Sequence, residues 1–147
     1  MDWIERVLIC GSRDFTDKAI FDAAMGKWVA KYGMPTDVIE GCARGADSLA
    51  EDWANAHGID LDGFGDMGDM GDIGPLPATV HTIHHYPADW DKYGKAAGPI
   101  RNKQMLVEGK PQAVIAFTHD LTRSRGTANM VSLARAAGLP VWLPLGE

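Results

Sequence analysis

The stretch Val7-Leu8-Ile9-Cys10-Gly11-Ser12-Arg13 joins four apolar residues to a glycine and an arginine. A short apolar run that stops at a glycine is typical of a buried strand of a parallel sheet, followed by a turn. Related glycine- or arginine-bearing stretches occur at residues 38–47, 98–102 and 113–127. In open parallel α/β sheets, the loops at the carboxyl ends of the strands form the ligand crevice. These stretches therefore predict both a fold class and the place of a site.

The segments outside the first strand alternate between strand and helix patterns. Apolar runs predict strands at 6–10, 37–40, 80–85, 112–117 and 140–143, and helical spacing predicts helices at 17–32, 45–57, 99–108 and 127–137. Residues 87–95 are expected to form a polar and aromatic loop. Strands that alternate with helices of this length imply right-handed βαβ units. We expect an α/β protein: a Rossmann-like three-layer α/β/α sandwich with a mainly parallel five-stranded sheet.

Length and composition fit one globular domain. The chain has 147 residues, of which 46% are hydrophobic, and this length suits a single domain spanning 1–147. The first six residues include three charged side chains and lead straight into a core-like strand, so they do not look like a signal peptide. No apolar run approaches the roughly 20 residues that a membrane helix needs. We expect a cytoplasmic protein with no membrane partner.

The acidic balance of the chain is concentrated in one segment. The formal net charge is −6, and five aspartates lie in residues 60–79, which contain no lysine or arginine. Several arginines instead fall at predicted loops and helix starts, which makes a local anion site plausible. Duplex DNA binding needs a broad positive face. The sequence therefore predicts against nucleic acid as a partner.

Residues 60–79 interrupt the strand and helix alternation with a glycine and aspartate repeat. Glycines recur at 65, 68, 71 and 74, and aspartates at 66, 69 and 72. The segment lacks the spacing of a calcium-binding loop. So much glycine is entropically expensive to order, which favours a solvated, flexible insertion. Weak metal binding or a partner contact is the alternative.

The strand-end loops carry the residue types that bind phosphate. Glycine lets backbone N–H groups approach an anion, a helix N-terminus adds partial positive charge, and arginine offers a planar fork. The fingerprint of a dinucleotide-binding Rossmann site and the P-loop pattern are both absent. We expect a phosphorylated small molecule, most plausibly a nucleotide, and no cofactor. The candidate ligand-binding residues are Gly11, Ser12, Arg13, Gly41, Arg44, Gly45, Asp47, Trp90, Arg101, Asn102, Arg125, Gly126 and Thr127.

Several of these residues also have a purely structural interpretation. Arg13 could be solvated in an ordinary turn, and Asp47 could only favour the dipole of the helix that it starts, rather than contact ribose hydroxyls. Trp90 could pack in a loop rather than stack on a base. Arg101 and Asn102 are expected to begin a helix, with their side chains toward its open end.

Cysteine and histidine spacing indicates no metal site. Cys10 and Cys42 each lie beside a glycine and lack CxxC or CxxH spacing, so buried reduced thiols are the simplest interpretation, with a disulfide or a reactive thiol as alternatives. The five histidines show no ligand spacing either. His84 and His85 are expected to end a strand, with one side chain exposed.

Residues 11–15, 41–47, 87–90, 94–102 and 125–128, taken together, resemble the YspA-type branch of the SLOG superfamily. The resemblance covers nearly the whole chain outside the insertion, and 94–102 is its most specific part. It implies a small Rossmann-like domain of bacteria or their phages that binds nucleotides or nucleotide-derived ligands, as a sensor or a sequestering module. Superfamily relatives often self-associate through helices that flank the sheet, which implies a homo-oligomer.

The wider superfamily contains the LOG phosphoribohydrolases, which the chain resembles at Arg101 and at Gly126-Thr127. Their pattern places a catalytic acid where this chain has Met130. A carboxylate stabilises the oxocarbenium-like state of N-glycosidic cleavage, and methionine cannot. The alternative function, hydrolysis of a nucleoside monophosphate or an NAD-like substrate, would use Arg101 and Asp47 as catalytic residues, or another acid such as Asp14, Glu40 or Asp120.

Overall fold

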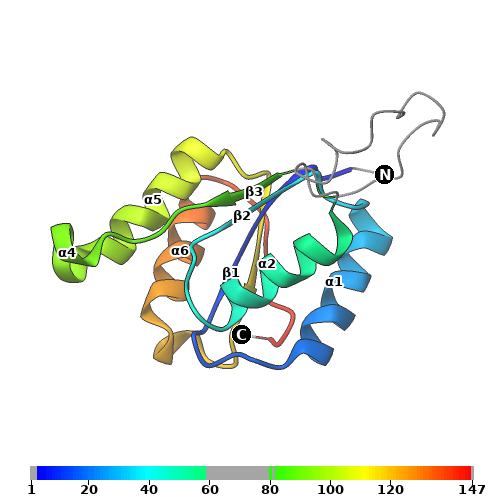
Figure 1. Cartoon of the computed structure of the whole chain (residues 1–147), viewed down its shortest axis with the longest axis horizontal. Coiled ribbons are helices and arrows are strands. Elements are labelled where there is room, and N and C mark those ends of the chain that lie inside the picture. Colours follow the sequence, from blue (N-terminus) through cyan, green and yellow to red (C-terminus); the bar gives the residue numbers. More distant parts are fainter. Residues whose placement is uncertain (1–2, 59–79, 81, 147) are drawn as a thin grey trace, which may run out of the picture.

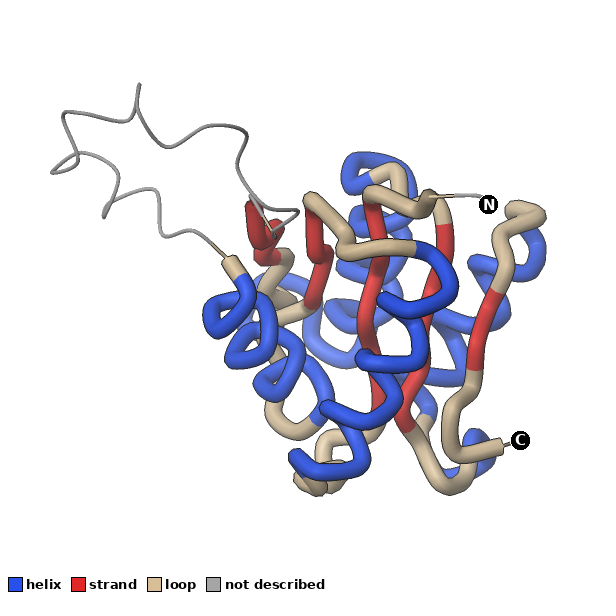
Figure 2. The backbone as a smooth tube through the Cα atoms, turned by 90° about the vertical axis from the view of Figure 1, so that its right-hand side faces the viewer, coloured by secondary structure: helices blue, strands red, loops and turns tan. Residues whose placement is uncertain are grey.

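The computed structural model describes residues 3–58, 80 and 82–146, and the predicted insertion at 60–79 lies outside them. Five strands form one sheet in the order β3-β2-β1-β4-β5, and every pairing is parallel (Figures 1 and 2). This confirms the predicted Rossmann-like α/β fold. The strands are β1 (Arg6–Gly11), β2 (Asp37–Glu40), β3 (Thr82–His85), β4 (Ala113–Phe117) and β5 (Val141–Trp142).

Two layers of helices cover the sheet. Figure 1 shows α1 (Lys18–Tyr32) and α2 (Ala46–His57) on one side, and α5 (Ala97–Gly109) and α6 (Arg125–Ala136) on the other. The predicted cap Asp17 begins α1, because its side chain accepts a hydrogen bond from the backbone N–H of Ile20. No helix in the described part of the chain is both long and apolar enough to span a membrane.

Alternate residues of the central strands divide the core into two halves. On β1, Val7 and Ile9 pack toward α1 and α2, whereas Leu8 and Cys10 pack toward α5 and α6. All five residues of β4 are buried, as expected of a strand with neighbours on both edges and helices on both faces. The apolar runs that predicted the strands are therefore the residues that join the sheet to both helical layers.

The order in which the strands are added to the sheet reverses at β1. The chain runs from β1 outward to β2 and β3, and then returns to the other side of β1 to form β4 and β5. The loops after β1 and β4 consequently leave the sheet toward opposite layers, which opens a crevice at the carboxyl ends of these two strands. A hydrogen bond of 2.9 Å from the Ser12 N–H to the Phe117 carbonyl holds the two loop origins together.

The prediction for residues 87–95 was wrong in part. Trp90–Tyr93 form a short helix, α4, which Asp89 caps through a hydrogen bond from the Lys92 N–H. A 3-10 turn, Gly94–Ala96, then runs directly into α5. Helix α5 therefore begins at Ala97, before Pro99, because a proline is tolerated in the first turn, where the N–H groups have no helical partner.

This earlier start of α5 corrects the expected position of two site residues. Arg101 and Asn102 lie in the second turn of the helix, and both are buried. They were predicted to begin the helix and to point toward its open end. Their side chains instead reach the crevice from the body of the helix.

Candidate functional site

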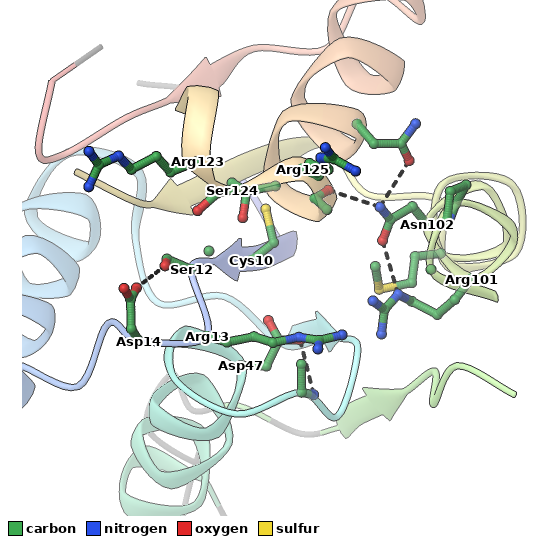
Figure 3. Close-up of a pocket in the computed structure, with 18 of the residues that line it drawn as sticks. Cys10, Ser12, Arg13, Asp14, Asp47, Arg101, Asn102, Arg123, Ser124 and Arg125 are labelled. Carbon is green, nitrogen blue, oxygen red and sulfur yellow. Dashed lines mark hydrogen bonds between the residues drawn. The ribbon is translucent and has the colours of Figure 1, made fainter. Parts of the chain in front are cut away.

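A cavity of about 840 Å³ opens at the carboxyl end of the sheet, between the loops after β1 and β4 and the helices α2, α5 and α6. Figure 3 shows its side chains converging from both layers of the fold. Ten of the predicted ligand-binding residues line this cavity: Gly11, Ser12, Arg13, Asp47, Trp90, Arg101, Asn102, Arg125, Gly126 and Thr127. Residues far apart in the sequence thus meet where the strand-end argument predicted.

A second cavity of about 310 Å³ adjoins the first and shares Arg13, Ala43, Trp90 and Arg101 with it. Two further predicted residues, Gly41 and Arg44, line this smaller cavity. Together the two cavities form one crevice with two compartments.

Gly45 lines neither compartment, because it sits under the loop after β1. It caps α2 with a φ of 74°, a conformation that favours glycine, and a side chain there would collide with the backbone of Ser12 and Arg13. The following residue, Ala46, donates its N–H to the Ser12 carbonyl over 3.3 Å. The contribution of Gly45 to the site is therefore the close approach of the loops after β1 and β2.

Arg101 is the most constrained cation of the crevice. Its side chain is only 9% exposed, its Nη1 donates to the Gly41 carbonyl over 2.6 Å, and its Nε donates to Oδ1 of Asn102 over 3.0 Å. Within the described residues, no carboxylate lies within 4.0 Å of its guanidinium. A guanidinium has five N–H donors, so this buried charge keeps donors for a ligand.

Asn102 connects α5 to α6. Its Nδ2 donates to the Gly126 carbonyl and to Oδ1 of Asn129, each over 3.0 Å, while its Oδ1 receives the Nε–H of Arg101 (Figure 3). Both ends of the amide are therefore engaged, which fixes its orientation. The same side chain positions the guanidinium and the first turn of α6.

The first turn of α6 faces the larger cavity. Ser124, Arg125, Gly126 and Thr127 all line it, and no side chain in the described part of the chain caps this helix. The first backbone N–H groups of a helix have no partner within the helix, and they lie at its positive end. The turn therefore presents backbone donors to the cavity, next to the buried guanidinium of Arg101.

The charge of the larger cavity opposes that of the whole chain. The chain carries a formal charge of −6, yet five cationic side chains line the cavity against two carboxylates. The cations are Arg13, Lys95, Arg101, Arg123 and Arg125, and the acids are Asp14 and Asp47. Such a local excess of positive charge concentrates anionic ligands in a cleft.

Trp90 lies between the two compartments. Its side chain is 47% exposed, and the Arg13 guanidinium lies over its ring, 5.3 Å from the ring centroid. An aromatic face paired with an arginine can accept a second planar group by stacking. The sequence leaves two interpretations of Trp90, as a packing residue of a loop or as a surface on which a base stacks. In this position its ring is accessible from the crevice, as stacking requires.

Asp47 has an unusual protonation equilibrium. Burial, and then the neighbouring carboxylate of Glu40, raise the pKa of Asp47 from 3.8 to about 7, against the opposing influence of Arg101 and of the Ala43 N–H, which donates to Oδ2 over 3.2 Å. A carboxyl group with a pKa near neutrality exchanges protons readily at physiological pH. Asp47 can therefore act either as a donor or as an acceptor toward a ligand.

Several lining residues were missing from the sequence-based set. They include Cys10, Lys95, Thr122, Arg123, Ser124 and Asn129. Lys95 reaches the cavity from the 3-10 turn before α5, and Asn129 from the second turn of α6. The predicted set was drawn mainly from the loops, so it did not include these two residues. Burial, together with Asp47, raises the pKa of the Cys10 thiol far above its ordinary value, so this cysteine lines the cavity as a neutral thiol.

The cysteine prediction holds for one residue of the two. Cys10 is buried and free, as expected, but Cys42 is exposed and free. Cys42 follows the end of β2 in a left-handed conformation, with a φ of 59°, and lines the smaller cavity. A strand-end position alone did not distinguish a residue inside the sheet from one beyond it.

An all-parallel sheet with a cationic crevice where its strand order reverses defines a Rossmann-like α/β protein. The chain belongs to the YspA, cpYpsA-related SLOG family, whose model matches residues 5–65. It is 33% identical over 138 residues to "Gene 61 protein" of Mycobacterium phage D29, and the alignment covers 94% of each chain. No solved structure matches the chain. Membership of this family suggests nucleotide-related binding or modification.

Proposed function

We propose that this protein binds a nucleotide or a nucleotide-derived ligand in the crevice, as a sensor or a sequestering module. The observation that carries the proposal is the buried guanidinium of Arg101, which has no carboxylate within 4.0 Å among the described residues. A buried charge is costly unless it is paired, and an anionic ligand supplies the pair.

In this proposal the ligand phosphate occupies the larger cavity between the first turn of α6 and the loop after β1. Gly126 and Thr127 offer backbone N–H groups, and Arg101 offers the charge. Ser12 borders the same space, with its hydroxyl donating to Oδ1 of Asp14. The base would lie on the Trp90 ring at the border of the two compartments, and Asp47 would meet the ribose hydroxyls.

The first test is a calorimetric titration with AMP, ADP-ribose, NAD and cyclic nucleotides, using the wild-type chain and Arg101→Ala. Hydrogen bonds to a charged group contribute about 1.5–3 kcal/mol, so we expect Arg101→Ala to weaken binding by about 10- to 100-fold. Lys103→Ala is the matched control, because Lys103 is an exposed cation of the same helix that lines neither cavity.

Two results would contradict the proposal: no binding of any nucleotide, or equal affinity of the wild type and Arg101→Ala. Thermal unfolding of both variants checks that the substitution leaves the fold intact. Arg101→Lys adds a second comparison, because lysine keeps the charge but not the planar fork that reaches Gly41 and Asn102 together.

A second candidate function, hydrolysis of an N-glycosidic bond, draws support from Asp47. Met130, at the position of the acid in the LOG pattern, is a residue of α6 that is completely buried in the core and does not line the cavity. Asp47 does line it, and a pKa of about 7 suits general acid–base chemistry.

The assay for this second function is the appearance of free base during incubation with AMP or NAD. If the protein hydrolyses an N-glycosidic bond, Asp47→Asn should abolish release of the base but retain binding of the substrate. Asp14→Asn is the comparison, since Asp14 is an exposed acid that lines the same cavity. Recovery of the intact ligand after long incubation would contradict hydrolysis and would be consistent with binding only.

A further inference from the structure

Three potential metal ligands meet where β2 and β3 end, beside the smaller cavity. Glu40 and His85 are the last residues of these two parallel strands and are directly paired in the sheet register. Cys42 follows Glu40 by two residues. Because both strands end at the same edge, the pairing brings a carboxylate, an imidazole and a thiol to one point.

The donor atoms are close to one another. Oε1 of Glu40 contacts both Nδ1 of His85 and Sγ of Cys42, the latter at 3.4 Å, and all three ligand atoms lie within 4.8 Å. A tetrahedral zinc site with bonds of about 2.0–2.3 Å places its ligand atoms about 3.3–3.8 Å apart. Small rotations of the His85 and Cys42 side chains would therefore bring the three atoms to coordination distance of one ion.

The electrostatics of this cluster favour a cation. Glu40 is 0% exposed, and among the described residues no lysine or arginine lies within 4.0 Å of its carboxylate. The carboxyl group of Asp47 is close enough to Glu40 to interact with it electrostatically, and it adds to the acidic surroundings of the cluster. A buried carboxylate of this kind gains from a bound positive ion.

The backbone around the cluster already holds the ligands in place. Oε2 of Glu40 accepts the Cys42 N–H over 2.7 Å, so Oε1, which contacts His85 and Cys42, is the oxygen that would coordinate an ion. This hydrogen bond ties the left-handed turn at Cys42 to the buried carboxylate, and the turn brings Sγ back over Glu40. A non-glycine residue is strained in this conformation, and the contacts of Cys42 must offset that strain.

We propose that Glu40, Cys42 and His85 form a binding site for a divalent cation of the zinc class. Thiolate and imidazole ligands select zinc over magnesium or calcium, which prefer oxygen alone. On binding, the Cys42 thiol loses its proton to solvent and the sulfur forms the bond to the ion. Three protein ligands leave one position of a tetrahedral ion open. Cys42 and His85 are both exposed, and Cys42 lines the smaller cavity, so this open position faces the crevice.

The test is a titration of the chelator-treated full-length chain with Zn²⁺ alone, followed by calorimetry, and with Co²⁺, followed by absorption. The expected result is one ion per chain, with the charge-transfer band of a cobalt–thiolate bond. Cys42→Ser should remove that band and weaken Zn²⁺ binding at least tenfold, and His85→Ala should weaken it similarly.

Cys10→Ser and His119→Ala are the matched controls, because neither residue belongs to the cluster, and both variants should bind like the wild type. Cys42 and His85 are exposed, so their substitution leaves the core intact; a thermal unfolding curve confirms this independently. The proposal is overturned if no ion binds, or if Cys42→Ser and His85→Ala bind Zn²⁺ as tightly as the wild type. Because the titration contains no nucleotide, its outcome is independent of the proposed nucleotide function.

Discussion

Nη1 of Arg101 donates to the carbonyl oxygen of Gly41 over 2.6 Å, and this bond fixes the guanidinium of α5 to the loop after β2. The absence of a side chain at position 41 makes the contact possible, because a Cβ there would collide with the guanidinium. The glycine after β2 thus determines where the buried charge of the crevice lies.

We expect Gly41→Ala to displace the Arg101 side chain and to lower nucleotide affinity about as much as Arg101→Ala does. The measurement is calorimetry with the best-binding nucleotide of the panel. Gly26→Ala is the control: its Cβ meets nothing within 4 Å, and alanine in a helix interior should raise the free energy of unfolding by about 0.5–1 kcal/mol. Unchanged affinity in Gly41→Ala would show that the guanidinium can move without consequence.

Asn102→Ala should loosen the contact between α5 and α6. The substitution leaves the Gly126 carbonyl and Oδ1 of Asn129 without their donor, and it frees the Nε–H of Arg101. We expect the free energy of unfolding to fall by about 1–3 kcal/mol, as measured with urea. Gln104→Ala, on the exposed side of the same helix, should change it little. Equal losses in the two variants would rule out a special role for the amide.

Asp47 should make the protein less stable as pH rises. Below pH 3.8 the carboxyl group is protonated in both states, whereas between 3.8 and about 7 only the folded state keeps the proton. The free energy of unfolding should therefore fall through this window, by up to about 4 kcal/mol from this group alone. Asp47→Asn removes this dependence, since an amide does not titrate.

Urea unfolding of the wild type and Asp47→Asn from pH 4 to pH 8, with a chelator present, measures the effect. Glu40 and Arg101, the charged groups that act on Asp47, are present in both chains. The variant should become the more stable of the two as pH approaches 8, with the difference growing from pH 4 upward. A difference that does not vary with pH would mean that Asp47 is already ionised throughout.

Trp90→Ala should weaken the binding of nucleotides more than the binding of inorganic phosphate. Stacking on an aromatic side chain contributes about 1–3 kcal/mol per base, which corresponds to about tenfold or more in affinity. Trp90→Phe should recover much of the loss. Tyr93→Ala, an exposed aromatic residue of the same short helix that lines neither cavity, is the control. Parallel losses for phosphate and nucleotide would assign Trp90 to the positioning of Arg13 instead.

Apolar periodicity was sufficient to predict the sheet and the helices that cover it, because strands buried on both faces are written as continuous apolar runs. The position of the crevice could be predicted from the same pattern, since a glycine and an arginine follow the predicted strands that end at Cys10 and at Glu40. The depth of Arg101 could not be predicted, because α5 continues a 3-10 turn that carries no strong start signal before Pro99.

The cluster of Glu40, Cys42 and His85 also could not be predicted from the spacing of these residues in the sequence. Its members come together through the register between β2 and β3, which pairs Glu40 with His85. Register is a property of the assembled sheet, and the insertion between these strands hides it in the linear order. The role of Gly45 in supporting the loop after β1 was missed for a similar reason, since the contact depends on the docking of α2.

The position of β1 between β2 and β4 has a consequence for the order in which the site can form. One wall of the crevice comes from the first third of the chain, and the opposite wall comes from α5 and α6. Under the proposed function, a nascent chain would therefore lack one wall of its binding site until α6 had been synthesised. For the same reason, occupancy of the crevice should protect amide hydrogens throughout the sheet against exchange, and not only those beside the ligand.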